Sequence, residues 1–167
     1  MKYTDHPGAG VSVHVDASPD AVWAVVSDID LSARLGTELQ KTEWIEPAEG
    51  PAVGATFRGY NKHQTIDMEW DVVCRIEVCD PGRAFGWRVT GDDGGPANWL
   101  FTLEPEGDGT RLKFDAVMGP GRSGLTPAIE AMPEREHEIV ASRLQDWFGN
   151  MAKVVEGAKA EAEAAAG

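Results

Sequence analysis

The chain comprises 167 residues, and its 28 acidic and 15 basic side chains give a formal net charge of -13 at pH 7. This length suits one domain with a single hydrophobic core. The Lys and Arg residues are spread singly among the acids, whereas binding of a phosphate backbone needs a clustered basic patch, so nucleic acid is excluded as the main partner. No apolar run has the length of a signal-peptide core or a bilayer span, so we expect a cytoplasmic protein without membrane insertion.

The first third of the chain predicts one strand and two short helices. Val11–Val15 alternates between apolar and polar residues, as a strand does. Ser18 is a good helix cap and Pro19 suits a first helical turn, so a helix should follow them. A second short helix is expected through Leu31–Leu35, closed by Gly36. Two more strands are expected at residues 41–46 and 55–62.

The segment Ile66–Val78 has the clearest pattern in the chain. Every even-numbered residue is apolar and nearly every odd-numbered one is charged, which indicates a strand with one dry and one wet face. At about 3.4 Å per residue such a strand would exceed about 40 Å and must curve. Cys74 and Cys79 lie an odd number of residues apart, so their side chains should point to opposite faces and remain free thiols.

Three further segments repeat this alternation and place aromatic residues on one face. Short turn signals separate them at Pro81–Gly82, Asp92–Gly95 and Glu106–Gly109, which favours antiparallel neighbours. A curved antiparallel sheet with an aromatic inner face follows. Its inward residues are expected to be Phe85, Trp87 and Val89, then Trp99, Phe101 and Leu103, then Leu112, Phe114, Ala116 and Met118.

The last part of the chain predicts a glycine-rich loop, a short segment from Pro127 and a long helix. Gly119–Gly124 offers little conformational restraint and is interpreted as a mobile gate. The helix should run from about residue 133 to 159, leaving 1–160 as one domain and 161–167 as a short tail. Its apolar stripe would comprise Val140, Leu144, Trp147, Phe148, Met151, Val154 and Val155.

Several short segments, in this order and spacing, carry a family resemblance. They are residues 16–23, 27–29, 53–61, 80–85, 99–105 and 109–111. The chain resembles the START and birch-pollen-allergen-like superfamily, and in particular its bacterial polyketide cyclase/dehydrase-like branch. The resemblance implies an α+β helix-grip fold, in which a curved antiparallel sheet of about seven strands wraps a long C-terminal helix and two short helices close one end. It also implies a deep cavity for an apolar or aromatic small molecule, but no particular reaction.

Candidate ligand-binding residues follow from the predicted inward positions of the sheet and the stripe of the helix. They are Phe57, Asn61, Trp70, Val72, Cys74, Phe85, Trp87, Trp99, Phe101, Phe114, Met118, Arg143, Trp147 and Met151. The alternative is that the rings form a solid core. Asn61 could equally end its strand by bonding to the backbone. The Arg143 guanidinium is suited to a carboxylate or enolate oxygen of a ligand, or it lies in solvent paired with Glu136 or Asp146.

No metal or cofactor is expected. His137 has Glu134, Glu136 and Glu138 around it, but no second histidine follows at ligand spacing. We favour a carrier or sensor that binds a polyketide-like or lipid-like molecule. A polyketide cyclase or dehydratase remains an alternative, but its candidate groups, Tyr60, Asn61, His63 and Arg143, form no clear pair in the sequence. A protein-binding module of the chaperone-activator type is the third possibility.

Overall fold

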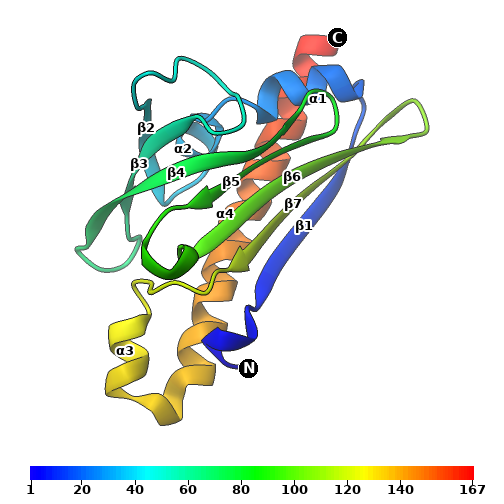
Figure 1. Ribbon diagram of the computed structural model, residues 1–167. Coiled ribbons are helices and arrows are strands. Elements are labelled where there is room, and N and C mark those ends of the chain that lie inside the picture. The colour runs from blue at the N-terminus through cyan, green and yellow to red at the C-terminus, as the bar shows by residue number, and fades with distance from the viewer.

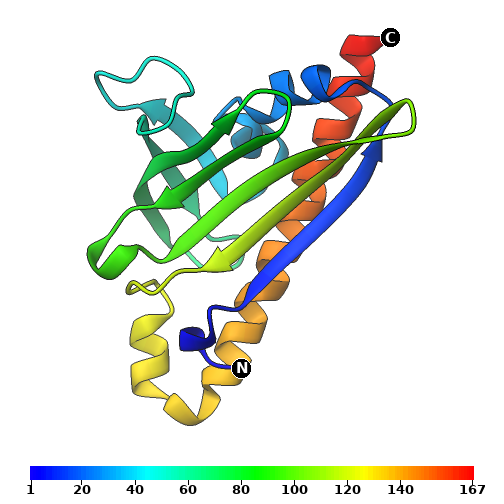
Figure 2. The ribbon, with the colours of Figure 1, turned by 45° about the vertical axis from the view of Figure 1, so that its right-hand side comes forward.

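The computed structural model describes residues 1–167 as one curved antiparallel sheet wrapped around a long helix (Figures 1 and 2). The strands are β1 (Gly8–Val15), β2 (Leu39–Trp44), β3 (Thr56–Lys62), β4 (Glu69–Asp80), β5 (Ala84–Val89), β6 (Ala97–Glu106) and β7 (Gly109–Met118). The α-helices are α1 (Pro19–Val26), α2 (Leu31–Leu35), α3 (Thr126–Ala131) and α4 (Glu136–Ala166), with short 3-10 turns at Tyr3–Asp5, Asp92–Gly94 and Pro133–Arg135. This architecture confirms the predicted helix-grip fold.

The seven strands are ordered β1-β7-β6-β5-β4-β3-β2, and every neighbouring pair is antiparallel. The predicted meander from β4 to β7 is therefore correct, and the first strand closes its far edge by pairing with the last. The pairs Phe85↔Phe101 and Phe101↔Phe114 put aromatic rings side by side on the inner face. This face supplies much of the core.

The helices lie where local signals placed them. Ser18 caps α1 by accepting a hydrogen bond from the backbone N–H of Ala21 at 3.2 Å. Gly36 ends α2. Both short helices pack against the C-terminal half of α4 and close that end of the fold, whereas α3 lies near the opposite end (Figure 1). Along the sheet, α4 packs chiefly against β1 and β7 and does not cover the inner face of β3 to β5.

Strand β4 differs from its sequence prediction at both ends. Ile66 and Met68 are exposed in the β3–β4 turn, because the ladder begins only where Lys62 pairs with Glu69. Near the other end, a bulge after Ile76 shifts the register, so that odd-numbered rather than even-numbered residues point inward beyond it. Cys79 therefore pairs with Phe85 and packs against the core on the same face as Cys74. Both thiols are free as predicted, although the expected opposite faces were wrong.

Helix α4 also corrects two expectations. It continues to Ala166 and buries Ala162, so residues 161–167 form its last turns rather than a separate tail. Phe148 is 54% exposed and does not belong to the apolar stripe, because it lies next to Trp147 around the helix and faces outward. No helix in the structure is long and apolar enough to cross a bilayer.

Candidate functional site

A cavity of about 1160 Å³ lies between the sheet and α4. It exists because α4 packs on β1 and β7 and stands away from the strands at the other side of the sheet. Its walls come from the inner faces of β3 to β7, from α4 and from the segment before β2. Residues of the β3–β4 turn and of the loop after β7 lie at its rim. The alternative of a solid aromatic core is therefore wrong.

The inner wall is a continuous aromatic cluster. Phe101 stacks on Phe114 with ring centroids 4.0 Å apart, and Trp87 lies parallel to Trp99 at 6.4 Å. Trp147 of α4 meets Trp99 at 4.9 Å, which joins the helix to the sheet. Such rings offer large apolar surface with favourable offset or edge contacts. The wall is thus suited to a flat or extended apolar molecule.

The structure brings thirteen of the fourteen predicted ligand-binding residues to this cavity. The exception is Met151, which is fully buried in the core behind the wall. The residues that line the cavity are Phe57, Asn61, Trp70, Val72, Cys74, Phe85, Trp87, Trp99, Phe101, Phe114, Met118, Arg143 and Trp147.

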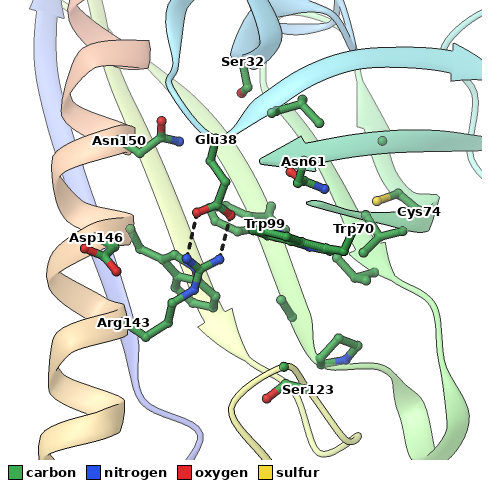
Figure 3. A pocket seen from close by; sticks show the side chains of 18 of the residues that line it. Ser32, Glu38, Asn61, Trp70, Cys74, Trp99, Ser123, Arg143, Asp146 and Asn150 are labelled. Atoms are coloured by element: carbon green, nitrogen blue, oxygen red, sulfur yellow. Dashed lines mark hydrogen bonds and ion pairs between the residues drawn. The ribbon is translucent and has the colours of Figure 1, made fainter. Parts of the chain in front are cut away.

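Arg143 makes an ion pair across the cavity with Glu38, a residue that no local pattern of the sequence indicates (Figure 3). Its Nη1 donates to Oε2 of Glu38 at 2.7 Å and its Nη2 donates to Oε1 at 2.6 Å. The two side chains are only 19% and 18% exposed, and the guanidinium carbon lies 5.8 Å from the Trp147 ring. The predicted solvated pairs with Glu136 or Asp146 do not form. A bidentate contact of this kind fixes both side chains.

Hydrogen bonds between Thr37 and Asn150 also join the segment before β2 to α4. Oδ1 of Asn150 accepts hydrogen bonds from the backbone N–H of Thr37 at 2.8 Å and from its hydroxyl at 3.2 Å. Asn150 and Arg143 are seven residues apart and therefore lie on one face of the helix, two turns from each other. The segment before β2 is thus tied to α4 at two points beside the cavity.

The indole Nε1 of Trp147 is buried and unpaired, and the amide of Asn61 makes no side-chain hydrogen bond. The Trp147 nitrogen has almost no accessible surface, so it is closed to a ligand in the cavity and its missing bond costs free energy. The Asn61 amide lies in the cavity lining and is a candidate contact for a ligand oxygen (Figure 3). The expectation that Asn61 only ends its strand is not met, since β3 continues to Lys62.

The titratable groups near the cavity form no hydrogen-bonded acid and base pair. Tyr60 points away from the cavity, where its hydroxyl donates to Glu43 at 2.6 Å, and this bond raises the pKa of Tyr60. His63 lies at the rim and accepts a bond from the backbone N–H of Thr65. Burial raises the pKa of the Cys74 thiol to about 12, so it lines the wall as a neutral group. No group of three His, Cys, Asp or Glu side chains is arranged to hold a metal ion.

The glycine-rich loop Gly119–Gly124 lies beside the cavity, as predicted, and its role as a mobile gate stays a prediction. Arg122, Ser123 and Gly124 line the cavity rim. The base of the loop is fastened, since the hydroxyl of Tyr3 donates to the carbonyl of Gly121 at 2.8 Å. Glu38, Asn150 and Tyr3 are site residues that were not predicted, because nothing local in their segments indicates a contact more than 100 residues away.

The chain is similar to proteins of one known family. The family described as "Polyketide cyclase / dehydrase and lipid transport" matches residues 9–159, so the chain belongs to this family, as the resemblance implied. No curated protein sequence matches the chain. Among solved structures, the Polyketide_cyc-like protein Cgl2372 from Corynebacterium glutamicum is 26% identical with a TM-score of 0.64, over 91% of this chain and 88% of that one.

Two more distant structures share the fold. The Zhui aromatase/cyclase from Streptomyces sp. R1128 is 17% identical with a TM-score of 0.66, over 94% of this chain and 93% of that one. Ara h 8.0201 is 18% identical with a TM-score of 0.55, over 92% of this chain and 97% of that one. At these identities the similarity concerns the fold alone.

Proposed function

We propose that this protein binds an apolar or aromatic small molecule, such as a polyketide or a lipid, and acts as its carrier or sensor. The observation that carries the proposal is the cavity of about 1160 Å³ walled by tryptophan and phenylalanine rings. A pocket of this size with a few polar groups among apolar walls has the general character of a small-molecule site. Membership of a family described by both polyketide chemistry and lipid transport agrees with such a ligand.

Binding without chemistry is favoured over catalysis because the cavity lacks a paired acid and base. General acid–base catalysis needs a proton donor or acceptor within hydrogen-bond reach of the reacting group. Arg143 is occupied by Glu38, and Tyr60 faces away from the cavity. A polyketide cyclase is the second candidate, favoured by the fold shared with the Zhui aromatase/cyclase.

Filling the cavity tests the proposal. Val72 lines the wall on β4, so Val72→Trp should weaken binding of the uncharged dye Nile red, whose emission rises on transfer to an apolar site. Val117 is an exposed valine on β7 outside the cavity, so Val117→Trp is the matched control and should bind the dye like wild type. Binding that is equal in all three proteins, or absent from the wild type for a varied apolar panel, would contradict the proposal.

Mass spectrometry of molecules that co-purify with the protein separates the two candidate functions. A carrier should return the isolated molecule unchanged after incubation with fresh protein. A cyclase should convert it to a cyclic isomer, or to a product lighter by one water when the new hydroxyl is eliminated.

A further inference from the structure

We infer that the cavity selects uncharged ligands over carboxylates, and that Glu38 sets this selection by occupying Arg143. The inference rests on the proposed function and narrows its ligand class to molecules whose polar end is an amide, a ketone or a hydroxyl. It is carried by the charges of the cavity lining and by their partners.

The first observation is the state of Arg143. Both terminal nitrogens of its guanidinium already donate to the two carboxylate oxygens of Glu38 (Figure 3). A ligand carboxylate could take this bidentate position only by displacing Glu38. The displaced carboxylate would then lie unpaired in a site where its side chain is only 18% exposed. Leaving a desolvated charge without its partner is unfavourable, so this exchange opposes acid binding.

The second observation is that the other cations of the lining are also paired. Arg122 binds Glu130 with two nitrogens, at 2.7 and 3.0 Å. Arg135 binds Glu138 at 2.8 Å. No lysine lines the cavity, so no lining cation is left without a carboxylate partner. The charge of each lining arginine is thus already compensated by a carboxylate, so an acidic ligand meets no uncompensated cation.

The third observation is an unpaired acid in the cavity lining. Six carboxylate side chains line the cavity, and five of them form ion pairs with an arginine or a lysine, namely Asp28, Glu38, Glu69, Asp71 and Glu138. The sixth, Asp146, has no ion-pair or hydrogen-bond partner, and Figure 3 shows it on α4 beside Arg143. Its uncompensated negative charge disfavours an anion at this place.

No unused polar group of the lining is a cation. The amide of Asn61 has no side-chain hydrogen bond and lines the cavity (Figure 3). This amide suits the oxygen of a carbonyl or hydroxyl as well as that of a carboxylate, but it brings no charge that would compensate an anion. An uncharged ligand can thus meet a polar group without breaking an ion pair.

The experiment compares 1-pyrenebutyric acid with its primary amide, which have the same ring and chain and differ in charge at pH 7.5. Binding is followed by energy transfer from tryptophan to pyrene. We expect wild type to bind the amide at least tenfold more tightly than the acid, a difference of about 1.4 kcal/mol. Equal affinities in wild type would overturn the inference alone. Failure of both compounds to bind would overturn the proposed function, and the inference with it.

Variants then assign the selection to Glu38. Glu38→Gln frees Arg143 and should raise affinity for the acid about tenfold while the amide changes less than threefold. Glu156→Gln removes one charge from an exposed position of α4 outside the cavity lining, so it is the matched control and should leave the ratio unchanged. Adding Arg143→Met to Glu38→Gln should remove the gain. Equal shifts for both ligands in Glu38→Gln, or a gain that survives in the double variant, would overturn the role of Glu38.

Discussion

The ion pair between Arg143 and Glu38 should stabilise the fold as well as shape the cavity. It joins α4 to the segment before β2 across a space that other side chains do not fill. Replacing either residue by alanine leaves the other charge without its partner in a largely buried place. A double-mutant cycle with Glu38→Ala, Arg143→Ala and the combined variant isolates the coupling energy of the pair.

The size of this coupling follows from geometry and burial. Exposed ion pairs contribute about 0.2–1 kcal/mol, because water and salt screen them. Hydrogen bonds to charged groups contribute about 1.5–3 kcal/mol when they are sheltered. The pair is bidentate and its side chains are 18% and 19% exposed, so we expect a coupling of about 1.5–2 kcal/mol. In a domain of this length, a loss of about 2 kcal/mol corresponds to roughly 4–8 °C in Tm.

Urea unfolding of the four proteins, followed by circular dichroism, measures the coupling. The exposed pair of Arg135 with Glu138 provides a control cycle, with side chains 55% and 63% exposed and an expected coupling below about 0.5 kcal/mol. Coupling in the Glu38 cycle should also persist at high salt, since a sheltered pair is screened less. If the two cycles give the same small value, the view of the Glu38 pair as a fixed element of the cavity wall is wrong.

Three further predictions concern a thiol, an acid and a helix cap. Because burial raises the pKa of Cys74 to about 12, iodoacetamide at pH 8 should modify the partly exposed Cys79 first. Peptide mass spectrometry measures the alkylation of each thiol, and the prediction is wrong if both thiols of the folded protein react as fast as they do in urea. The hydrogen bond from Arg34 holds the pKa of Glu161 below its usual 4.5, so the unfolded chain takes up this proton first as the pH falls. The stabilisation by Glu161 is therefore fully present above about pH 4.5 and lost below it. Glu161→Gln should lower the free energy of unfolding by under about 1 kcal/mol at pH 7 and not change it in acid. A difference between the urea midpoints of variant and wild type that persists at low pH would refute this. Ser18→Ala removes the cap of α1 and should cost about 1 kcal/mol in urea unfolding, whereas an unchanged midpoint would show that the cap bond contributes nothing.

Much of the fold could be read from the sequence because its signals are local. The alternation around Phe101 and Phe114 gave the inner face of the sheet, and both rings are buried there. Ser18 and Gly36 marked the ends of the short helices. The same periodicity identified nearly all of the cavity wall, since residues that share a face of a strand point to the same space.

The alternation of apolar and polar residues predicts the wrong face where a strand contains a bulge. The bulge after Ile76 reverses the parity of β4, so Cys79 turns inward and Val78 turns out. A bulge depends on how two strands fit together, and the alternation within one strand cannot reveal it. The extent of α4 was misjudged for a similar reason, because Ala162 gains its burial from the elements packed around the helix end.

The sequence by itself determined the elements, their order and the apolar face of each, because hydrophobic period and caps act over a few residues. The tertiary structure alone decided that the aromatic face borders an open cavity, since this depends on where α4 stands over the sheet. It also decided that Arg143 meets Glu38, 105 positions away, rather than an acid on its own helix. Charged side chains pair with whatever the fold brings within reach, so only the packed chain shows that the arginine of the cavity is already occupied.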